Sequence, residues 1–447
     1  MMFRPARLTR RHLLAGFGAA AAAGPAATIH AQSQHPQIHA IDAMPTPLSL
    51  GPDHRETTVW SLKTDGSSGS LRFRQSESML GLVVNNGLPA PFVLNWHGLD
   101  GAAAIEPLTA RPPISPGGTD RYSLPFRQAG TFMCDSRLLG DGLAQPSPAQ
   151  ALIVEEQSPA EVDRDEVMLI EDWRLDAEGL PVAPGTTEKK VGPPLYLVNG
   201  KPSPDINLHI NERLRLRFIN ACQRNVIAIE IKNIGVRIIA IDSQPAEPFL
   251  ARNGRLVLAP GTRIDAVIDA TLPSGTTSAI ALHDGGGKPH EIARLHVSAD
   301  GPGRAAPLPA PPALPSTSLP ARLDLRNALR ADVPLPSSEG TPTSWSRPAL
   351  FSTRRTPAFR VKRGRTAVLA LTNTTTKPMV FRLHGHHARL LDRLDDGWKP
   401  FWLDTVLVDT GQTQRIAFVA DVAGAWLIET MAVEWSAPRQ VSWFAVE

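Results

Sequence analysis

The sequence contains only two cysteines in 447 residues, too few for a disulfide framework or a cysteine-rich metal site. After residue 31, no stretch approaches the ~18 apolar residues that cross a bilayer, and long amphipathic helical patterns are scarce. There is no Gly-x-Ser-x-Gly elbow and no His-Glu-x-x-His motif, and residues 285–287 lack the following helix that a phosphate loop needs. These absences argue against a disulfide-stapled scaffold, a transmembrane segment in the mature chain, and the common hydrolase motifs.

Turn-forming residues, in contrast, are abundant, with 42 prolines and 34 glycines. Such counts favour many short strands joined by turns over a helical bundle. Apolar and polar residues alternate in several segments, among them 213–218, 256–258 and 367–371. Alternating runs that are broken by Gly, Pro or Asn about every 8–12 residues are typical of antiparallel sandwiches. We therefore expect an all-β fold.

The first 31 residues contain four arginines and no acidic residue. The pair Arg10-Arg11 precedes an Ala- and Gly-rich apolar stretch, and Ala27 or Ala31 would suit a cleavage site. This pattern indicates an export signal, and the paired arginines resemble a twin-arginine leader, which carries folded proteins across the bacterial inner membrane. An ordinary export signal and an uncleaved anchor are the alternatives. We expect a soluble protein in the periplasm, exported by the twin-arginine route.

The leader also changes how the net charge is interpreted. The whole chain has a formal charge of +3, but without residues 1–31 it keeps 42 basic and 43 acidic residues, a charge of −1. No basic stripe with interleaved aromatic residues is present, so we expect no nucleic-acid partner.

An internal repeat predicts three related domains. Asn86, Asn220 and Asn373 each end an apolar run, and the position 11 residues later holds His97, Ile231 or His384. The segment from Ala129 to Asp135 also matches that from Ala423 to Glu429. Composition shifts then predict domains at residues 40–150, 160–300 and 321–447, with a Pro-rich linker at 301–320.

Six short motifs recur in the same order as in a known family. They are Asn95-Trp96-His97-Gly98, Leu197-Val198-Asn199-Gly200-Lys201-Pro202, Ala240-Ile241-Asp242-Ser243-Gln244-Pro245, Leu258-Ala259-Pro260-Gly261-Thr262-Arg263-Ile264-Asp265, Leu383-His384-Gly385-His386-His387 and Phe401-Trp402-Leu403-Asp404-Thr405-Val406. Their order and spacing resemble the multicopper oxidases, over nearly the whole chain after the leader. The resemblance implies three cupredoxin-like Greek-key β-sandwich domains, with a copper cluster between the outer two.

The copper ligands that the resemblance implies are mostly replaced. Of the family's copper-binding histidines and single cysteine, this chain retains only His97 and His384. Thr430 stands where the type 1 copper has its thiolate. The other family histidine positions that we located hold Asn95, Asp135, Arg137, Met379, Arg382, Glu429, Met431 and Trp435.

Two hypotheses follow for this site. In the first, Asp135, Arg137, Arg382 and Glu429 form a charge cluster that replaces the copper ions, because buried charges must be paired; the alternative is that these side chains are solvated in an enlarged channel. In the second, His97 and His384 hold a residual metal ion with help from a neighbouring carboxylate; the alternative is that both are structural. We expect no cofactor, and copper is the alternative.

The multicopper oxidase family includes copper-free periplasmic members that serve cell division without catalysis, and this chain resembles them. We therefore expect a non-catalytic envelope or cell-division scaffold or binding protein, whose partners are envelope or division proteins. The alternative is a multicopper-oxidase-type oxidoreductase or metal-binding protein with a residual copper site.

Overall fold

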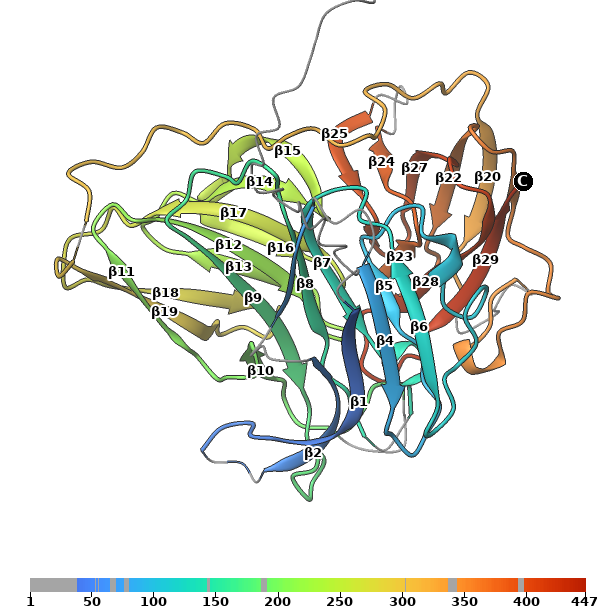
Figure 1. The fold of residues 1–447 in the computed structure, drawn as a ribbon, viewed down its shortest axis with the longest axis horizontal. Coiled ribbons are helices and arrows are strands. Elements are labelled where there is room, and N and C mark those ends of the chain that lie inside the picture. Colours follow the sequence, from blue (N-terminus) through green and yellow to red (C-terminus); the bar gives the residue numbers. More distant parts are fainter. Residues whose placement is uncertain are drawn as a thin grey trace, which may run out of the picture. The chain divides into compact units, whose positions relative to one another are not determined.

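The computed structural model describes residues 38–52, 54, 56–64, 70–75, 80–142, 145–185, 191–301, 303–336, 344–392 and 398–447. The predicted leader, residues 1–31, lies outside these ranges and stays a prediction. The described elements are almost all strands, and six sheets pair into three sandwiches (Figure 1). The predicted all-β fold is confirmed. Within the described part of the chain, no helix is long and apolar enough to cross a membrane.

The first sandwich consists of two four-stranded sheets with the orders β2-β1-β4-β6 and β3-β8-β7-β5. Ile41 and Val84 from one sheet pack with Phe132 and Leu152 from the other in a single core. The strands and the short 3-10 helices are β1 (Ile38–Leu48), β2 (Thr57–Thr64), β3 (Ser70–Arg74), β4 (Leu80–Asn86), β5 (Asn95–His97), η1 (Ala103–Ile105), β6 (Thr119–Leu124), β7 (Gly130–Asp135), η2 (Arg137–Leu139) and β8 (Gln150–Glu155).

The second sandwich has sheets in the orders β10-β9-β12-β17-β14-β15 and β11-β19-β18-β13-β16. Leu216 and Ile268 pack against Ile229 and Leu282 in its core. Its elements are β9 (Arg164–Trp173), β10 (Leu195–Val198), β11 (Asp205–His209), β12 (Arg213–Asn220), β13 (Ile227–Ile231), β14 (Arg237–Ile241), β15 (Gln244–Leu250), η3 (Arg252–Gly254), β16 (Arg255–Leu258), β17 (Arg263–Asp269), β18 (Thr277–His283) and β19 (His290–Ser298).

The third sandwich has sheets in the orders β20-β22-β27-β24-β25 and β21-β29-β28-β23-β26. Leu369 and Phe418 pack against Phe381 and Ile428 in its core. Its elements are β20 (Leu329–Pro334), η4 (Pro348–Leu350), β21 (Arg360–Val361), β22 (Thr366–Thr372), β23 (Met379–Leu383), β24 (Ala388–Leu391), β25 (Trp398–Leu403), β26 (Thr405–Val408), β27 (Thr413–Val419), β28 (Gly424–Ala432) and β29 (Gln440–Val446).

The repeated asparagines make equivalent hydrogen bonds in each sandwich. The side-chain amides of Asn86, Asn220 and Asn373 are buried, and each donates to carbonyls of two or three other residues. Each side-chain oxygen accepts from the backbone N–H two residues later. These bonds pin the turn that follows the strand, because buried backbone groups must find partners. The turn therefore fixes where the next strand begins, and that strand ends at, or one residue before, the position 11 residues after the asparagine.

The alternation predicted at residues 213–218 lies on β12, where every side chain is buried. Leu214, Leu216 and Phe218 enter the core of the second sandwich. Arg213, Arg215 and Arg217 point to the opposite face, as the period of two requires. They stay buried because carboxylates meet them there, among them Asp269, Glu156 and Asp165.

Candidate functional site

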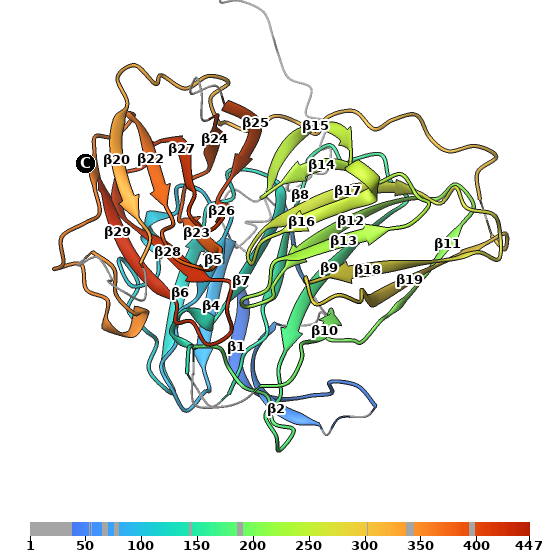
Figure 2. The ribbon, with the colours of Figure 1, turned by 180° about the vertical axis from the view of Figure 1, so that it is seen from behind.

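The residues at the predicted copper positions lie on facing strands of the first and third sandwiches. β5 and β7 are antiparallel neighbours and place Asn95 opposite Asp135. β23 and β28 do the same for Arg382 and Glu429. Both ribbon views show β5 beside β23 and β28 (Figures 1 and 2). The repeat therefore brings equivalent strand positions of two sandwiches together at one interface.

Arg382 is the central side chain of this interface, and it is buried. Its Nη1 atom lies 3.2 Å from Glu429 Oε2 and 3.2 Å from His97 Nε2. Its Nη2 atom donates to Asn95 Oδ1 at 3.1 Å and to the carbonyl of Trp96. The guanidinium thus crosses from the third sandwich to the first, where it bonds to Asn95 and Trp96 of β5 and contacts His97.

Glu429 balances the positive charge. Its carboxylate pairs with Arg382 and, through Oε1, with Arg439, and Oε2 lies 3.4 Å from His384 Nε2. Burial alone would raise the pKa of Glu429, but Arg439, His384 and Arg382 outweigh burial and hold the pKa well below its usual range. Glu429 is therefore an anion that neighbouring cations surround.

His97 and Asp135 form a hydrogen-bonded pair, with 2.8 Å between Nε2 and Oδ2. Burial and then the Arg382 charge lower the pKa of His97 to about 4, although Asp135 opposes them. Burial would raise the pKa of Asp135, but His97 and the nearby arginines lower it to about 2. At neutral pH the pair is a neutral imidazole that donates to a carboxylate, and it leaves Nδ1 of His97 as an acceptor.

His384 connects carboxylates of both sandwiches. Its Nδ1 atom lies 2.8 Å from Glu106 Oε1 in the first sandwich, and its Nε2 atom faces Glu429 in the third. Burial and Arg382 would lower the pKa of His384, but Glu106 and Glu429 raise it. Both surviving family histidines therefore face carboxylates in this structure.

Arg137 lies beside Asp135, but its side chain extends to the second sandwich. The backbone N–H of Arg137 donates to Asp135 Oδ1 at 2.9 Å. Its guanidinium donates to Glu171 at 2.5 Å and to the carbonyls of Ser147 and Ala221, both at 2.6 Å. In this structure, Arg137 therefore joins the first and second sandwiches.

The remaining replaced positions are filled by packing and hydrogen bonds within the protein. Met379 belongs to the core of the third sandwich, and the Thr430 hydroxyl donates to the Val380 carbonyl at 2.9 Å. The sulfur of Met431 lies 3.7 Å from Arg224 Nη1. Arg174 stacks over the ring of Trp435 at 5.1 Å, a cation–π contact.

A cavity of about 20 Å³ remains at this interface, with His97, Asp135, Arg382 and Arg439 among its walls. That volume fits about one water molecule. Two buried nitrogens, His97 Nδ1 and Arg439 Nε, have no hydrogen-bond partner within the described part of the chain. A single water could donate to the first or accept from the second.

Copper does not fit this set of residues. Arg382 is a permanent cation that cannot ligate a metal, and it touches His97 Nε2, the atom that faces the centre of the interface. Thr430 cannot supply the soft thiolate that an electron-entry copper needs. In the described ranges, no group of three or more His, Cys, Asp or Glu side chains is arranged to hold a metal ion.

The other two interfaces also contain buried ion pairs. Arg263 of the second sandwich donates to both oxygens of Asp404 in the third, at 2.7 and 3.0 Å. Burial would raise the pKa of Asp404, but Arg263 holds it well below its usual range. Arg224 of the second sandwich donates to both oxygens of Asp141 in the first, at 2.8 Å each. Each pair of sandwiches thus shares buried Arg–carboxylate or His–carboxylate contacts.

His387 lies where all three sandwiches meet. Its Nδ1 atom is 2.7 Å from Asp100 Oδ1 of the first, and its Nε2 atom is 2.6 Å from the Asp242 carbonyl of the second. Both ring nitrogens face acceptors, which suits the protonated form. Burial alone would lower the pKa of His387, but Asp100 raises it to about 9.

Sequence reasoning did not identify Arg439, Glu106, Glu171 or Asp100 as part of these interfaces. None of them lies at a family ligand position, so the motif comparison contained no signal for them. Asp242, Arg263 and Asp404 do lie in the quoted motifs. One Arg and two Asp in separate motifs were the available sequence signal for a buried ion pair.

Fold and site together define a protein of three cupredoxin-like sandwiches whose cluster position is filled by paired charges. Family models for the multicopper oxidases match residues 164–290 and 327–440. The chain belongs to the multicopper oxidase family.

Relatives and solved structures agree with this assignment. Laccase-1 of Cryptococcus neoformans is 28% identical over 221 residues, which cover 42% of this chain and 34% of the laccase. Laccase-9 of Arabidopsis thaliana is 24% identical over 264 residues, 54% of this chain and 42% of the laccase. The matches to these relatives cover only about a third to two fifths of their length. A multi-copper oxidase structure from Pseudomonas thermotolerans has a TM-score of 0.76 at 23% identity, with 92% of this chain and 100% of that chain covered.

Replacement of Arg382 tests the central pair. Arg382→Ala would leave Glu429 with one fewer cation and the Trp96 carbonyl without its donor, and should lower the free energy of unfolding by roughly 3–5 kcal/mol. Chemical denaturation of the purified protein measures this change. Arg360→Ala is the matched control, because Arg360 pairs with Glu447 at the exposed surface and should change stability little. A free energy of unfolding for Arg382→Ala within experimental scatter of the wild-type value would contradict the pairing.

The His387–Asp100 contact predicts a pH dependence. Because the pKa of His387 rises from 6.5 to about 9 on folding, its stabilisation is complete below pH 6.5 and is lost as the pH rises through 9. The loss should be about 3 kcal/mol. Denaturation of the wild type and of His387→Gln across this pH range measures the loss. The free energy of unfolding of the variant should fall less as the pH rises. Equal slopes for the two proteins would refute the assignment.

Proposed function

We propose that this protein is a non-catalytic member of the multicopper oxidase family that acts as a scaffold or binding protein in the bacterial envelope, with cell-division proteins as candidate partners. The observation that carries the proposal is the Arg382 guanidinium, which stands at a family histidine position, bonds to Asn95 and Glu429, and lies 3.2 Å from His97 Nε2. A fixed cation there opposes metal binding and at the same time joins the first and third sandwiches.

The electron-entry position supports the same conclusion. Thr430 is buried and its hydroxyl is hydrogen-bonded to the backbone, while Met379 and Trp435 replace imidazoles. Without a thiolate and two imidazoles, the position lacks the ligand softness that a one-electron copper needs. An electron donor therefore has no copper at this position to which it could pass an electron.

The leader supports a location in the envelope. Residues 1–31 have the basic start, the apolar stretch and the small residues of an export signal. Export of a folded chain suits a protein with three interdependent sandwiches, because their buried interfaces form before transport.

Copper loading tests the absence of oxidase chemistry. The mature protein is incubated with excess copper, freed of unbound metal and measured for copper content and for oxygen uptake with a phenolic donor; a laccase treated in the same way is the positive control. We expect less than one tightly held copper per chain and no turnover above the buffer. Several coppers per chain with turnover would overturn the proposal and establish the oxidoreductase alternative.

Export and location are tested with a fluorescent protein fused to the C-terminus in a diderm bacterium. Twin-arginine export delivers the folded fusion, so fluorescence should appear at the cell periphery and collect at division sites. Arg10→Lys/Arg11→Lys should retain it in the cytoplasm, while Arg4→Lys/Arg7→Lys, the matched control, should not. Cytoplasmic fluorescence of the wild type would refute the envelope location, and an even periphery without enrichment would refute the division role.

A further inference from the structure

The Pro-rich segment between the second and third sandwiches has a regular conformation of its own. Residues 307–318, here called the strap, form no strand or helix. Pro311 is buried and Leu308, Leu314 and Thr317 are partly buried, while every residue between them is exposed. The less exposed positions therefore recur every three residues.

A period of three identifies the backbone geometry. Polyproline II has three residues per turn and a rise of about 3.1 Å per residue, so every third side chain lies on one edge. A strand has a period of two and an α-helix one of 3.6, and a 3-10 helix, which also has three residues per turn, is not present in this segment. The strap therefore has the period and the composition of a polyproline II helix, with one edge against the protein and two edges in solvent.

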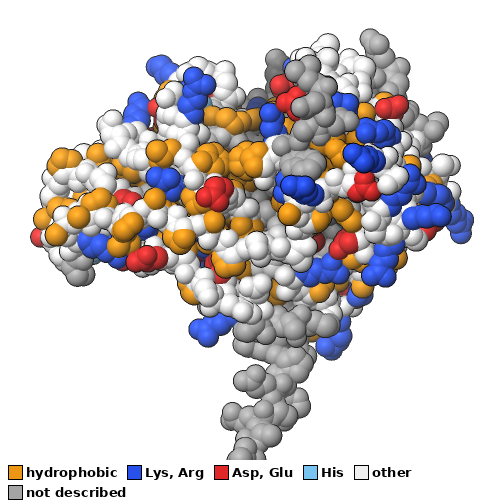
Figure 3. Space-filling view, turned by 90° about the horizontal axis from the view of Figure 1, so that it is seen from above, with side chains coloured by type: hydrophobic (Ala, Val, Ile, Leu, Met, Phe, Trp, Pro, Cys, Tyr) orange, Lys and Arg blue, Asp and Glu red, His pale blue; other side chains and the backbone are white. Residues whose placement is uncertain are grey.

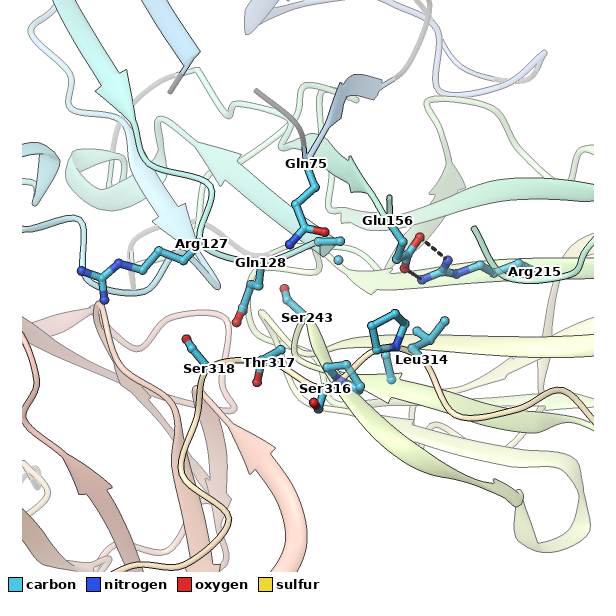
Figure 4. Close-up of a pocket in the computed structure, with 15 residues that line it drawn as sticks. Gln75, Arg127, Gln128, Glu156, Arg215, Ser243, Leu314, Ser316, Thr317 and Ser318 are labelled. Carbon is cyan, nitrogen blue, oxygen red and sulfur yellow. Dashed lines mark hydrogen bonds and ion pairs between the residues drawn. The ribbon is translucent and has the colours of Figure 1, made fainter. Parts of the chain in front are cut away.

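Hydrogen bonds hold the strap at both ends. Arg213 Nη2 donates to the Leu308 carbonyl at 2.9 Å, and the Thr317 hydroxyl donates to Gln244 Oε1 at 2.9 Å. Both bonds lie on the buried edge. Figure 4 shows Thr317 and Leu314 beside a cavity of about 90 Å³, which Gln75 and Gln128 also line. The fixed ends set which edges of the strap face outward.

One exposed edge is a row of prolines. Pro309, Pro312 and Pro315 are three residues apart and all exposed, so their rings are spaced by about 9 Å along the strap. Residues 309–316 make no hydrogen bond to other described residues through their backbone, and their carbonyls remain available. The strap crosses the upper side in Figures 1 and 2, and Figure 3 looks onto that side, where hydrophobic side chains lie among scattered charged ones.

We propose that the strap is a recognition segment for a partner domain with an aromatic-lined groove. Polyproline II segments with the spacing Pro-x-x-Pro dock between aromatic side chains, which stack on the rings while donors reach the carbonyls. The fixed ends reduce the entropy that a free peptide loses on binding. Residues 307–318 contain no charged residue, so the proline rings and the carbonyls supply the contacts to the groove.

This inference deepens the proposed function, because it gives the scaffold a specific contact surface. The test uses the full mature protein as immobilised bait for a periplasmic extract, with a photo-crosslinking residue in place of Ala313. The proline-row variant is Pro309→Ala/Pro312→Ala/Pro315→Ala. The matched control, Pro307→Ala/Pro311→Ala, removes prolines outside the row. A synthetic peptide of residues 307–318 serves as competitor.

We expect the proline-row variant to capture the crosslinked partner at least tenfold less than wild type, the control to capture it normally, and the peptide to compete. The partner must contain an aromatic groove. Capture that is equal in both variants, that resists the peptide, or that is absent altogether overturns the strap proposal and leaves the scaffold proposal standing. Copper-dependent turnover in the earlier test would instead overturn the scaffold proposal, whatever the strap binds.

Discussion

One buried guanidinium constrains the contact between the first and third sandwiches, beside an apolar cluster that includes Leu138 and Leu427. Arg382 must be paired, because a buried cation without partners would destabilise the fold by several kcal/mol. Glu429 supplies the charge, Asn95 and the Trp96 carbonyl supply acceptors on the facing strand, and His97 Nε2 lies 3.2 Å from the guanidinium. Glu429 also contacts Arg439 and His384, so the pairing of Arg382 constrains the positions of these two side chains as well. The space that a metal cluster would need is filled with side chains and room for about one water.

The same kind of contact recurs at the other interfaces. Arg137 with Glu171, and Arg263 with Asp404, join the second sandwich to its two neighbours. Buried ion pairs lose much of their attraction to desolvation, but they are directional and tolerate no shift of register. We interpret them as devices that specify how the sandwiches sit together, while the three separate apolar cores supply most of the stability.

The sequence predicted the sandwiches well because their signals are local and repeated. Asn86, Asn220 and Asn373 pin the same turn in each sandwich, and that turn keeps the spacing to the next strand. The direction of a long side chain is not a local property, so the sequence did not show that Arg137 turns toward Glu171. Arg439 and Glu106 lie outside any motif and reach the site only through the packing of the third sandwich against the first, where β28 meets η1. The sequence likewise did not show that every third residue of the strap is less exposed. Proline-rich composition predicts an extended linker, but not which edge of it is covered.

The paired Arg382 guanidinium, rather than a metal, lies between the outer sandwiches at the family's cluster position. The most direct measurement is a crystal structure of the copper-soaked protein, with diffraction data collected at the copper absorption edge. We expect continuous density for the Arg382 guanidinium between His97 and Glu429, and no anomalous peak within bonding distance of His97 or His384. An anomalous peak bonded to either histidine, with Arg382 displaced, would contradict it.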